Sequence, residues 1–169
     1  MKIGVISDTH QKTMSEGLEE FLDELSKKVD VLIHAGDITG FETLSMINRL
    51  FKDKVYSVRG NMDDFSLQKN LPERLCKDFD GVSIGITHSK GAPYEAAENA
   101  ISVFRDDLPD ILVFGHSHHA MIKEYKNTVL FNPGSLCDLT YAPYTSYGMI
   151  EIKNGRIVRK EILRKRWHD

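Results

Sequence analysis

The first half of the chain alternates between short apolar runs and longer segments with a helical apolar stripe. The run Lys2–Ser7 is typical of a buried strand. In residues 14–29 the apolar positions recur at spacings of three and four, which predicts an amphipathic helix. The same alternation then predicts a strand at Val31–Ala35, a helix with an apolar face from Phe41 to Phe51, and a strand at Val55–Arg59.

The second half is predicted to be mostly strand. One further helix is expected at residues 93–104, because Pro93 occupies a favoured first-turn position. The pair Asn154-Gly155 predicts a hairpin turn, since both residues tolerate positive φ. The predicted strands are Val82–Thr87, Ile111–Phe114, Val129–Phe131, Tyr147–Ile152 and Arg156–Ile162. Strands alternating with helices, followed by a run of strands, indicate an α/β sandwich with a mixed sheet.

A polar cluster follows six of the predicted strands. The clusters are Asp8-Thr9-His10, His34-Ala35-Gly36-Asp37, Asn61-Met62-Asp63, Thr87-His88-Ser89, His116-Ser117-His118-His119 and Asn132-Pro133-Gly134-Ser135. In an α/β sheet the carboxyl ends of the strands form the crevice where ligands bind. We therefore expect side chains that are far apart in the sequence to meet at one edge.

The residue types in these clusters are those of a metal site. The candidate ligands are Asp8, His10, Asp37, Asn61, His88, His116 and His118. Imidazole and carboxylate groups without thiolates favour manganese, iron, zinc or nickel. One tetrahedral ion takes only about four ligands, so this set suits two divalent ions that share a carboxylate. Two such ions, about 3.5–4 Å apart, can clamp a phosphoryl group and activate a bridging water as hydroxide.

A charge count leaves the substrate class open. Two divalent ions bring four positive charges; Asp8 and Asp37 remove two, and a bridging hydroxide removes one more. The single charge that remains matches a phosphodiester, but it also suits a monoester.

Composition indicates the class of protein and the partners to expect. The chain has 169 residues, of which 41% are hydrophobic and 28% are charged, as in an ordinary globular domain. The net charge of -3 argues against nucleic acid as a partner, because a phosphate-neutralising surface is normally basic. No apolar stretch approaches the roughly 20 residues that span a bilayer, and no signal peptide is visible. We expect a single cytoplasmic domain over residues 1–169, with no membrane partner and with a homo-oligomer (dimer or tetramer) left open.

Taken in order, the motifs resemble those of the calcineurin-like metallophosphoesterase family. They are D-T-H at Asp8, G-D at Asp37, G-N-x-D at Asn61, the single His88, and G-H-S-H ending at His118. The length and the N-P-G-S segment look most like the small prokaryotic YfcE-like phosphodiesterases. The resemblance implies a four-layer α-β-β-α sandwich with mixed sheets and a hydrolase that acts on phosphodiester bonds.

The resemblance also implies a role for each matching residue. The first metal would be held by Asp8, His10 and His118, the second by Asn61, His88 and His116, and Asp37 would bridge both. Asn61 would also contact the substrate phosphate, and Asp63 would orient neighbouring groups. Mn²⁺ or Ni²⁺ would be the first ions to assay, with iron, zinc and magnesium left open.

One position departs from the family pattern. Many phosphatases of this family read G-N-H-D or G-N-H-E, and that histidine is thought to protonate the leaving group. Here the position is Met62, whose thioether has no proton to donate. We therefore expect a preference for diesters with good leaving groups, or another proton donor, for which His119 is the nearest free histidine.

Several alternatives stay open at this point. The retromer scaffold subunit resembles this fold but acts as a binding module that has lost key metal-binding residues, and fold alone does not imply catalysis. A phosphomonoesterase or nucleotidase would use the same site. His34 is expected to be structural, while Asn132 and Ser135 either form a turn or support the metal edge. The tyrosines near Tyr141 face either the site or a dimer partner.

Overall fold

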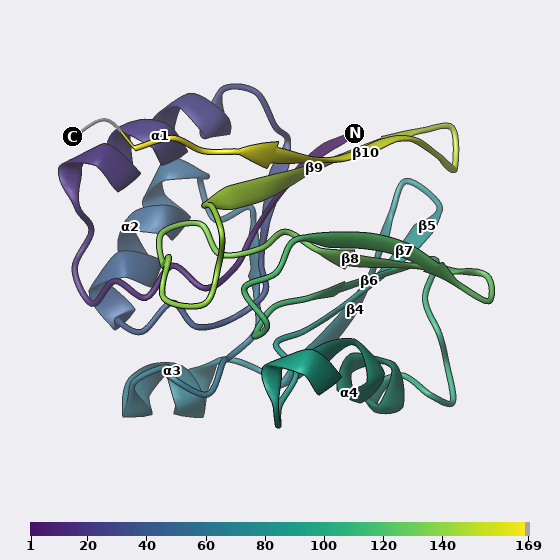
Figure 1. The fold of residues 1–169 in the computed structure, drawn as a ribbon. Helices are drawn as coiled ribbons and strands as arrows, with labels where there is room; N and C mark the ends of the chain where they lie inside the picture. Colours follow the sequence, from purple (N-terminus) through teal and green to yellow (C-terminus); the bar gives the residue numbers. More distant parts are fainter. Residues whose placement is uncertain (168–169) are drawn as a thin grey trace.

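The computed structural model describes residues 1–167, which form two five-stranded sheets (Figure 1). The first sheet has the strand order β10-β9-β1-β2-β3 and the second has the order β4-β5-β6-β8-β7. The strands of the first sheet are β1 (Lys2–Ile6), β2 (Val31–His34), β3 (Val55–Ser57), β9 (Ser146–Lys153) and β10 (Arg156–Arg164). Those of the second are β4 (Arg74–Phe79), β5 (Val82–Thr87), β6 (Ile111–Phe114), β7 (Met121–Tyr125) and β8 (Thr128–Asn132).

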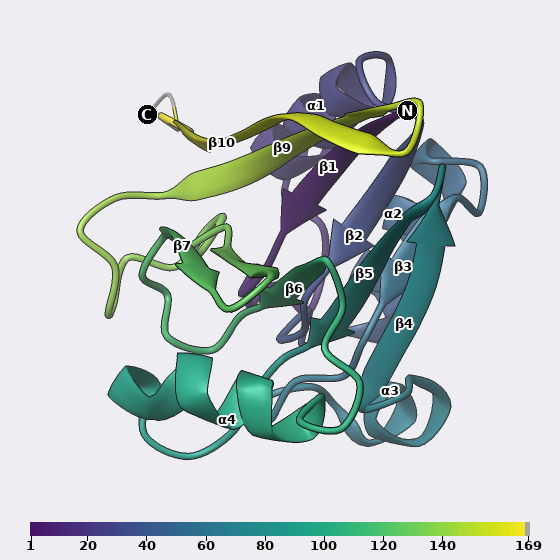
Figure 2. The same ribbon diagram turned by 90° about the vertical axis from the view of Figure 1, so that its right-hand side faces the viewer.

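Both sheets are mixed. Strands β1, β2 and β3 pair in parallel, as do β5, β6 and β8, while β9, β10, β4 and β7 pair antiparallel with their neighbours. Helices α1 (Glu16–Ser26) and α2 (Phe41–Leu50) lie against the outer face of the first sheet (Figure 1). Helix α4 (Ala96–Val103), which follows a 3₁₀ turn at Pro93–Glu95, lies against the second sheet (Figures 1 and 2).

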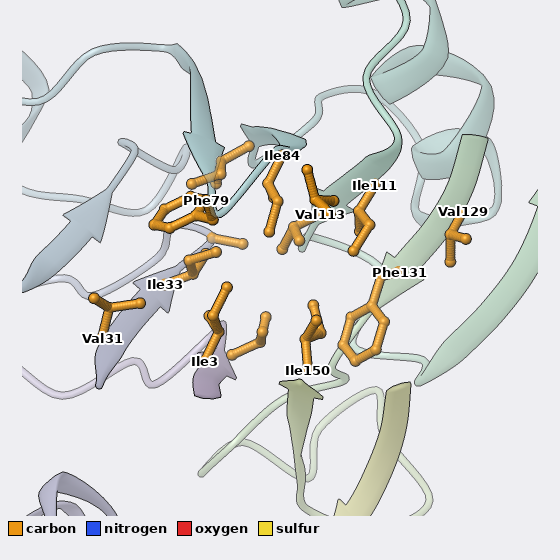
Figure 3. Close-up of a cluster of buried hydrophobic side chains, with 14 of the residues drawn as sticks. Ile3, Val31, Ile33, Phe79, Ile84, Ile111, Val113, Val129, Phe131 and Ile150 are labelled. Atoms are coloured by element: carbon orange, nitrogen blue, oxygen red, sulfur yellow. The ribbon is translucent and has the colours of Figure 1, made fainter. Parts of the chain in front are cut away.

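Three apolar clusters hold these layers together. The cluster between the two sheets includes Ile33, Ile84, Val113 and Phe131 (Figure 3). A second cluster packs α1 and α2 on the first sheet, and a third packs α4 on the second sheet. The predicted four-layer α-β-β-α sandwich is therefore confirmed. Among residues 1–167, no helix combines the length and the apolar character needed to cross a bilayer.

Three elements were not predicted. Strands β4 and β7 lie at the edges of the second sheet, and most of their side chains are exposed or half-buried. Edge strands of this kind lack the buried apolar run by which a strand is recognised. Helix α3 (Phe65–Asn70) has six residues, and only Leu67 among them is buried. It is too short to show a helical period, although Asp64 caps it by accepting a hydrogen bond from Leu67 N at 2.9 Å.

Candidate metal centre

The polar clusters after the parallel strands meet at one edge, as the sequence predicts. The amide nitrogen of His116, after β6, donates to Asp8 Oδ2, after β1, at 3.2 Å. These residues belong to different sheets, so the centre lies where the carboxyl ends of both parallel strand sets come together. The fold thus gathers groups separated by more than a hundred positions in the chain.

Asp8, His10 and His118 form one group that could hold a metal ion. His118 Nε2 lies 3.2 Å from Asp8 Oδ1 and 3.3 Å from His10 Nε2. Asp8 and His118 are buried, while His10 is half-buried. Asp8 Oδ1 is buried and accepts no hydrogen bond from residues 1–167, which is costly for a carboxylate oxygen unless a cation lies next to it.

Asn61, His88 and His116 form a second group of side chains. Asn61 Oδ1 lies 3.1 Å from His88 Nε2 and 3.0 Å from His116 Nδ1. His88 Nδ1 is 2.8 Å from Ala35 O, and His116 Nε2 is 2.8 Å from Gly91 O. A carbonyl can only accept, so each ring places an N–H on the backbone and turns its other nitrogen toward Asn61 Oδ1.

The nitrogens that face Asn61 are therefore the ones that carry lone pairs in neutral rings. A lone pair that faces an amide oxygen needs a cation between them, either a proton or a metal ion. The Nε2 atoms of His10 and His118 also face each other, and this contact is favourable when one of them carries a proton or when a metal ion lies between them. This donor set fits a metal ion on both sides of the centre.

Two carboxylates lie between these two groups of side chains. Asp37 Oδ2 is 3.2 Å from His88 Nε2 and 3.7 Å from His10 Nε2, so one oxygen faces a histidine of each predicted metal. Asp8, Asp37 and His88 form the second group that could hold an ion, and it shares Asp8 with the first. The geometry accommodates Asp37 as the bridge, and Asp8 also faces both sides.

The charges around His88 also favour a cation at this point. Burial lowers the pKa of His88, but its hydrogen bond with Asp37 and the charges of Asp8 and Asp37 outweigh burial and raise the pKa to about 9. For Asp37, burial raises the pKa, but the hydrogen bond and charge of His88 outweigh it and hold that pKa below its usual value. The carboxylates thus attract a cation to this point, and a metal ion would have to displace the His88 proton.

Backbone geometry is unusual at the centre. Asp8, His10, Asp37, His116 and His118 all have φ between 50° and 71°, in the left-handed region. Residues other than glycine seldom adopt it, and such conformations gather at functional sites. Five of the seven predicted ligands are held this way, which sequence periodicity does not reveal.

Gly60 makes a close backbone approach possible. A Cβ atom at this position would collide with the backbone nitrogen and Oδ1 of Asp37. The glycine therefore lets the loop after β3 pass directly over the buried carboxylate. The next residues use that approach, because Met62 N donates to Asp37 Oδ1 at 2.7 Å.

Asp63 joins two loops of the site. Its Oδ1 accepts from Thr39 N and its Oδ2 accepts from Gly60 N, both at 2.7 Å. It is buried, and it connects the loop after β2 to the loop after β3. This placement suits the supporting role that the resemblance implies.

The N-P-G-S segment does both things that were left open. Asn132 Oδ1 accepts from Gly134 N at 2.9 Å and so forms the turn. Asn132 Nδ2 donates to Gly115 O, and Ser135 Oγ donates to Asp8 O at 2.8 Å. The segment therefore also holds the backbone next to two predicted ligands.

The other two histidines among residues 1–167, His34 and His119, lie apart from these two groups of ligands. His34 is fully buried and lies 3.2 Å from Thr9 Oγ1, and burial lowers its pKa to about 3. His119 is exposed and lines a separate cavity with Tyr94 and Met121. Within residues 1–167 no hydrogen bond or ion pair joins its ring to the ligands, so its role as a proton donor stays a prediction.

Asp138 is a site residue that the sequence analysis missed. Its Oδ2 lies 3.7 Å from His118 Nδ1 and 3.9 Å from His10 Nε2. Three residues further on, Tyr141 packs its ring edge-on against His118, with centroids 5.7 Å apart. Tyr141 thus faces the site. Asp138 does not directly follow a predicted strand, so the pattern that found the ligands could not find it.

Comparison with known proteins identifies the family. The model of the calcineurin-like phosphoesterase superfamily domain matches residues 1–155. The chain belongs to this family. A probable metallophosphoesterase of Methanocaldococcus jannaschii, MJ0623, is 32% identical over 136 residues, which cover 80% of this chain and 68% of that protein. The phosphodiesterase MJ0936 of the same organism is 27% identical over 150 residues, covering 81% and 85%.

Solved structures agree on the fold. Vps29 of Entamoeba histolytica, crystallised with Zn²⁺, has a TM-score of 0.75 and 25% identity, and the match covers 98% of each chain. YfcE, a phosphoesterase from Escherichia coli, has a TM-score of 0.67 and 21% identity, covering 95% of this chain and 98% of that one. The likeness to small metallophosphoesterases that the motifs indicate is therefore confirmed.

Proposed function

We propose that this family member is a metal-dependent phosphodiesterase with two divalent ions. The observation that carries the proposal is the set of imidazole nitrogens and carboxylate oxygens that face one another across the centre. The first ion would be held by Asp8, His10 and His118, the second by Asn61, His88 and His116, and Asp37 would bridge them. Mn²⁺ or Ni²⁺ are the ions we would load first.

When bound, the two ions would supply positive charge for the phosphoryl oxygens and lower the pKa of a water. The residues of the chain do the remaining work. Asp37 is kept in place by Met62 N, and His88 and His116 are oriented by the carbonyls of Ala35 and Gly91. Hydrolysis breaks one phosphorus–oxygen bond; water supplies the new oxygen, and its proton ends on the leaving group.

Position 62 favours diesters with good leaving groups. Met62 is 59% exposed at the edge of the centre, next to Asn61, and its side chain has no proton to give. An aryl oxide leaves without a proton donor, whereas an alkoxide does not. Similarity to the phosphodiesterase MJ0936 over 81% of the chain also supports diesters as the substrate class.

The test combines elemental analysis with chelation. We expect about two divalent ions per chain, loss of bis(p-nitrophenyl) phosphate hydrolysis on chelation, and recovery on adding Mn²⁺ or Ni²⁺. Asp37→Asn should lose both metal and activity, whereas Asp106→Asn removes the same charge from an exposed position and should keep both. p-Nitrophenyl phosphate, assayed alongside, measures monoesterase activity.

The similarity to Vps29 supports a second candidate, a binding scaffold. The same experiment separates the two. A folded protein that binds metal but hydrolyses neither ester under any divalent ion would contradict the enzyme and favour the scaffold.

A further inference from the structure

A cavity of about 600 Å³ lies beside the predicted ligands of the second metal. One wall comes from the segment between β3 and β4, and the opposite wall comes from α4. Asn61 and His88 belong both to this cavity and to the metal centre. Small-molecule sites in proteins usually have roughly 300–1,000 Å³. A phosphodiester at the metals would therefore have room here for one of its two ester groups.

The charged groups of the cavity suit a molecule that carries phosphate. Glu73 pairs with Arg59 at 3.2 Å and with Lys90 at 2.6 Å. Two cations and one carboxylate leave one net positive charge. Arg59 also donates to the carbonyls of Gln68 and Leu71, so it braces the wall. The side chain of Lys90 is 71% exposed, and its pairing with Glu73 leaves two of its three N–H donors for a ligand.

Two amide side chains supply hydrogen-bond acceptors. Gln68 Nε2 donates to Gly60 O, and Asn99 Nδ2 donates to Lys90 O at 2.6 Å. Because a carbonyl only accepts, these contacts commit the NH₂ ends and leave Gln68 Oε1 and Asn99 Oδ1 as acceptors. Within residues 1–167 no protein donor reaches either oxygen. Ser102 of α4 lines the same cavity.

We propose that this cavity seats the ester group that stays on phosphorus after hydrolysis, and that it selects a hydroxyl-bearing group of nucleoside size. This inference rests on the proposed function. Hydroxyl donors on that group would pair with the amide oxygens, whereas an aryl group would leave them unpaired. A site built to hydrogen-bond a substrate hydroxyl discriminates strongly against an analogue that lacks it.

The test compares two diesters with the same leaving group. Thymidine 5′-(p-nitrophenyl phosphate) and bis(p-nitrophenyl) phosphate both release p-nitrophenol, so the ratio of their kcat/KM values reports the retained group alone. Asn99→Leu should lower this ratio roughly 3- to 10-fold, which is the loss expected for one hydrogen bond. Ser102→Trp should lower it by occupying the cavity, and Asn70→Leu, an exposed position outside the cavity, should leave it unchanged.

A binding measurement separates failure of the subsite from failure of the proposed function. Thymidine 5′-monophosphate, added to the metal-free protein and, separately, to the zinc-loaded protein, should shift the side-chain amide NMR signals of Asn99 and Gln68. If wild type hydrolyses both esters but the ratio is the same in Asn99→Leu and Ser102→Trp as in wild type, the proposed subsite is contradicted and the proposed phosphodiesterase function is not. If wild type hydrolyses neither ester, the proposed function is contradicted. Amide signals that do not move on adding the nucleotide would then contradict the subsite as well.

Discussion

His118 Nδ1 lies 3.7 Å from Asp138 Oδ2, which places a carboxylate behind a predicted metal ligand. That nitrogen is buried and has no hydrogen-bond partner among residues 1–167, while Nε2 of the same ring faces Asp8. Carboxylates placed behind metal-binding histidines fix the tautomer and orientation of the ring. We predict that Asp138, in the loop after β8, orients His118 toward the first predicted metal.

Removing this carboxylate should weaken metal binding. We expect Asp138→Asn to lower Mn²⁺ affinity about 10-fold or more, measured by isothermal titration calorimetry. In the metal-free protein, ¹⁵N chemical shifts should show His118 with its proton on Nδ1 in wild type and a mixed tautomer in the variant. Asp106→Asn is the matched control for charge. Equal affinities in wild type and Asp138→Asn would contradict the role.

Gly60 should not tolerate a side chain. A methyl group there would displace Asp37, and misplacing a catalytic group by about 1 Å costs on the order of 100-fold in rate. Gly60→Ala is therefore expected to lose metal and phosphodiesterase activity together. Gly17→Ala is the control, because its Cβ would meet only the Trp167 ring, at 3.8 Å. A fully active Gly60→Ala would show that the loop moves freely.

Met62→His should extend the enzyme to poor leaving groups. The backbone N–H that holds Asp37 is kept, and a general acid contributes at least about 100-fold in enzymes that have one. We expect a rise of about tenfold or more for alkyl diesters and little change for aryl diesters. Phe65→His adds a histidine at a more exposed neighbouring position and should leave the rates for both alkyl and aryl diesters unchanged. If wild type already cleaves both classes equally, and His119→Ala changes nothing, the explanation fails.

Buried His34 should make the metal-free protein sensitive to acid. Burial lowers its folded-state pKa to about 3, against 6.5 in the unfolded chain, so between these values the unfolded state binds more protons. Its contribution is present above pH 6.5 and is lost as the pH falls toward 3. Between pH 6.5 and 5 this amounts to about 2 kcal/mol. Urea unfolding at several pH values should show that His34→Gln loses less unfolding free energy than wild type as the pH falls from 6.5 to 5. Equal losses in the two proteins would contradict this explanation.

Much of the fold could be predicted because its signals are local. Residues 3–6 and Ile111–Phe114 show their burial as unbroken apolar runs, and α1 and α2 show theirs as a helical stripe. Strands β4 and β7 were missed because edge strands bury few side chains, and α3 because one buried leucine makes no period. Their positions depend on neighbours that are distant in the chain.

By itself, the sequence determined which groups stand at the strand ends, and hence the chemistry that the centre can perform. Only the tertiary structure decided how they face one another. The left-handed backbone at His118, the carbonyl that turns His88, and the approach of Asp138 all depend on contacts between distant loops. The type of each side chain is a local property of the sequence, whereas the orientation and exposure of a histidine ring depend on packing across two sheets.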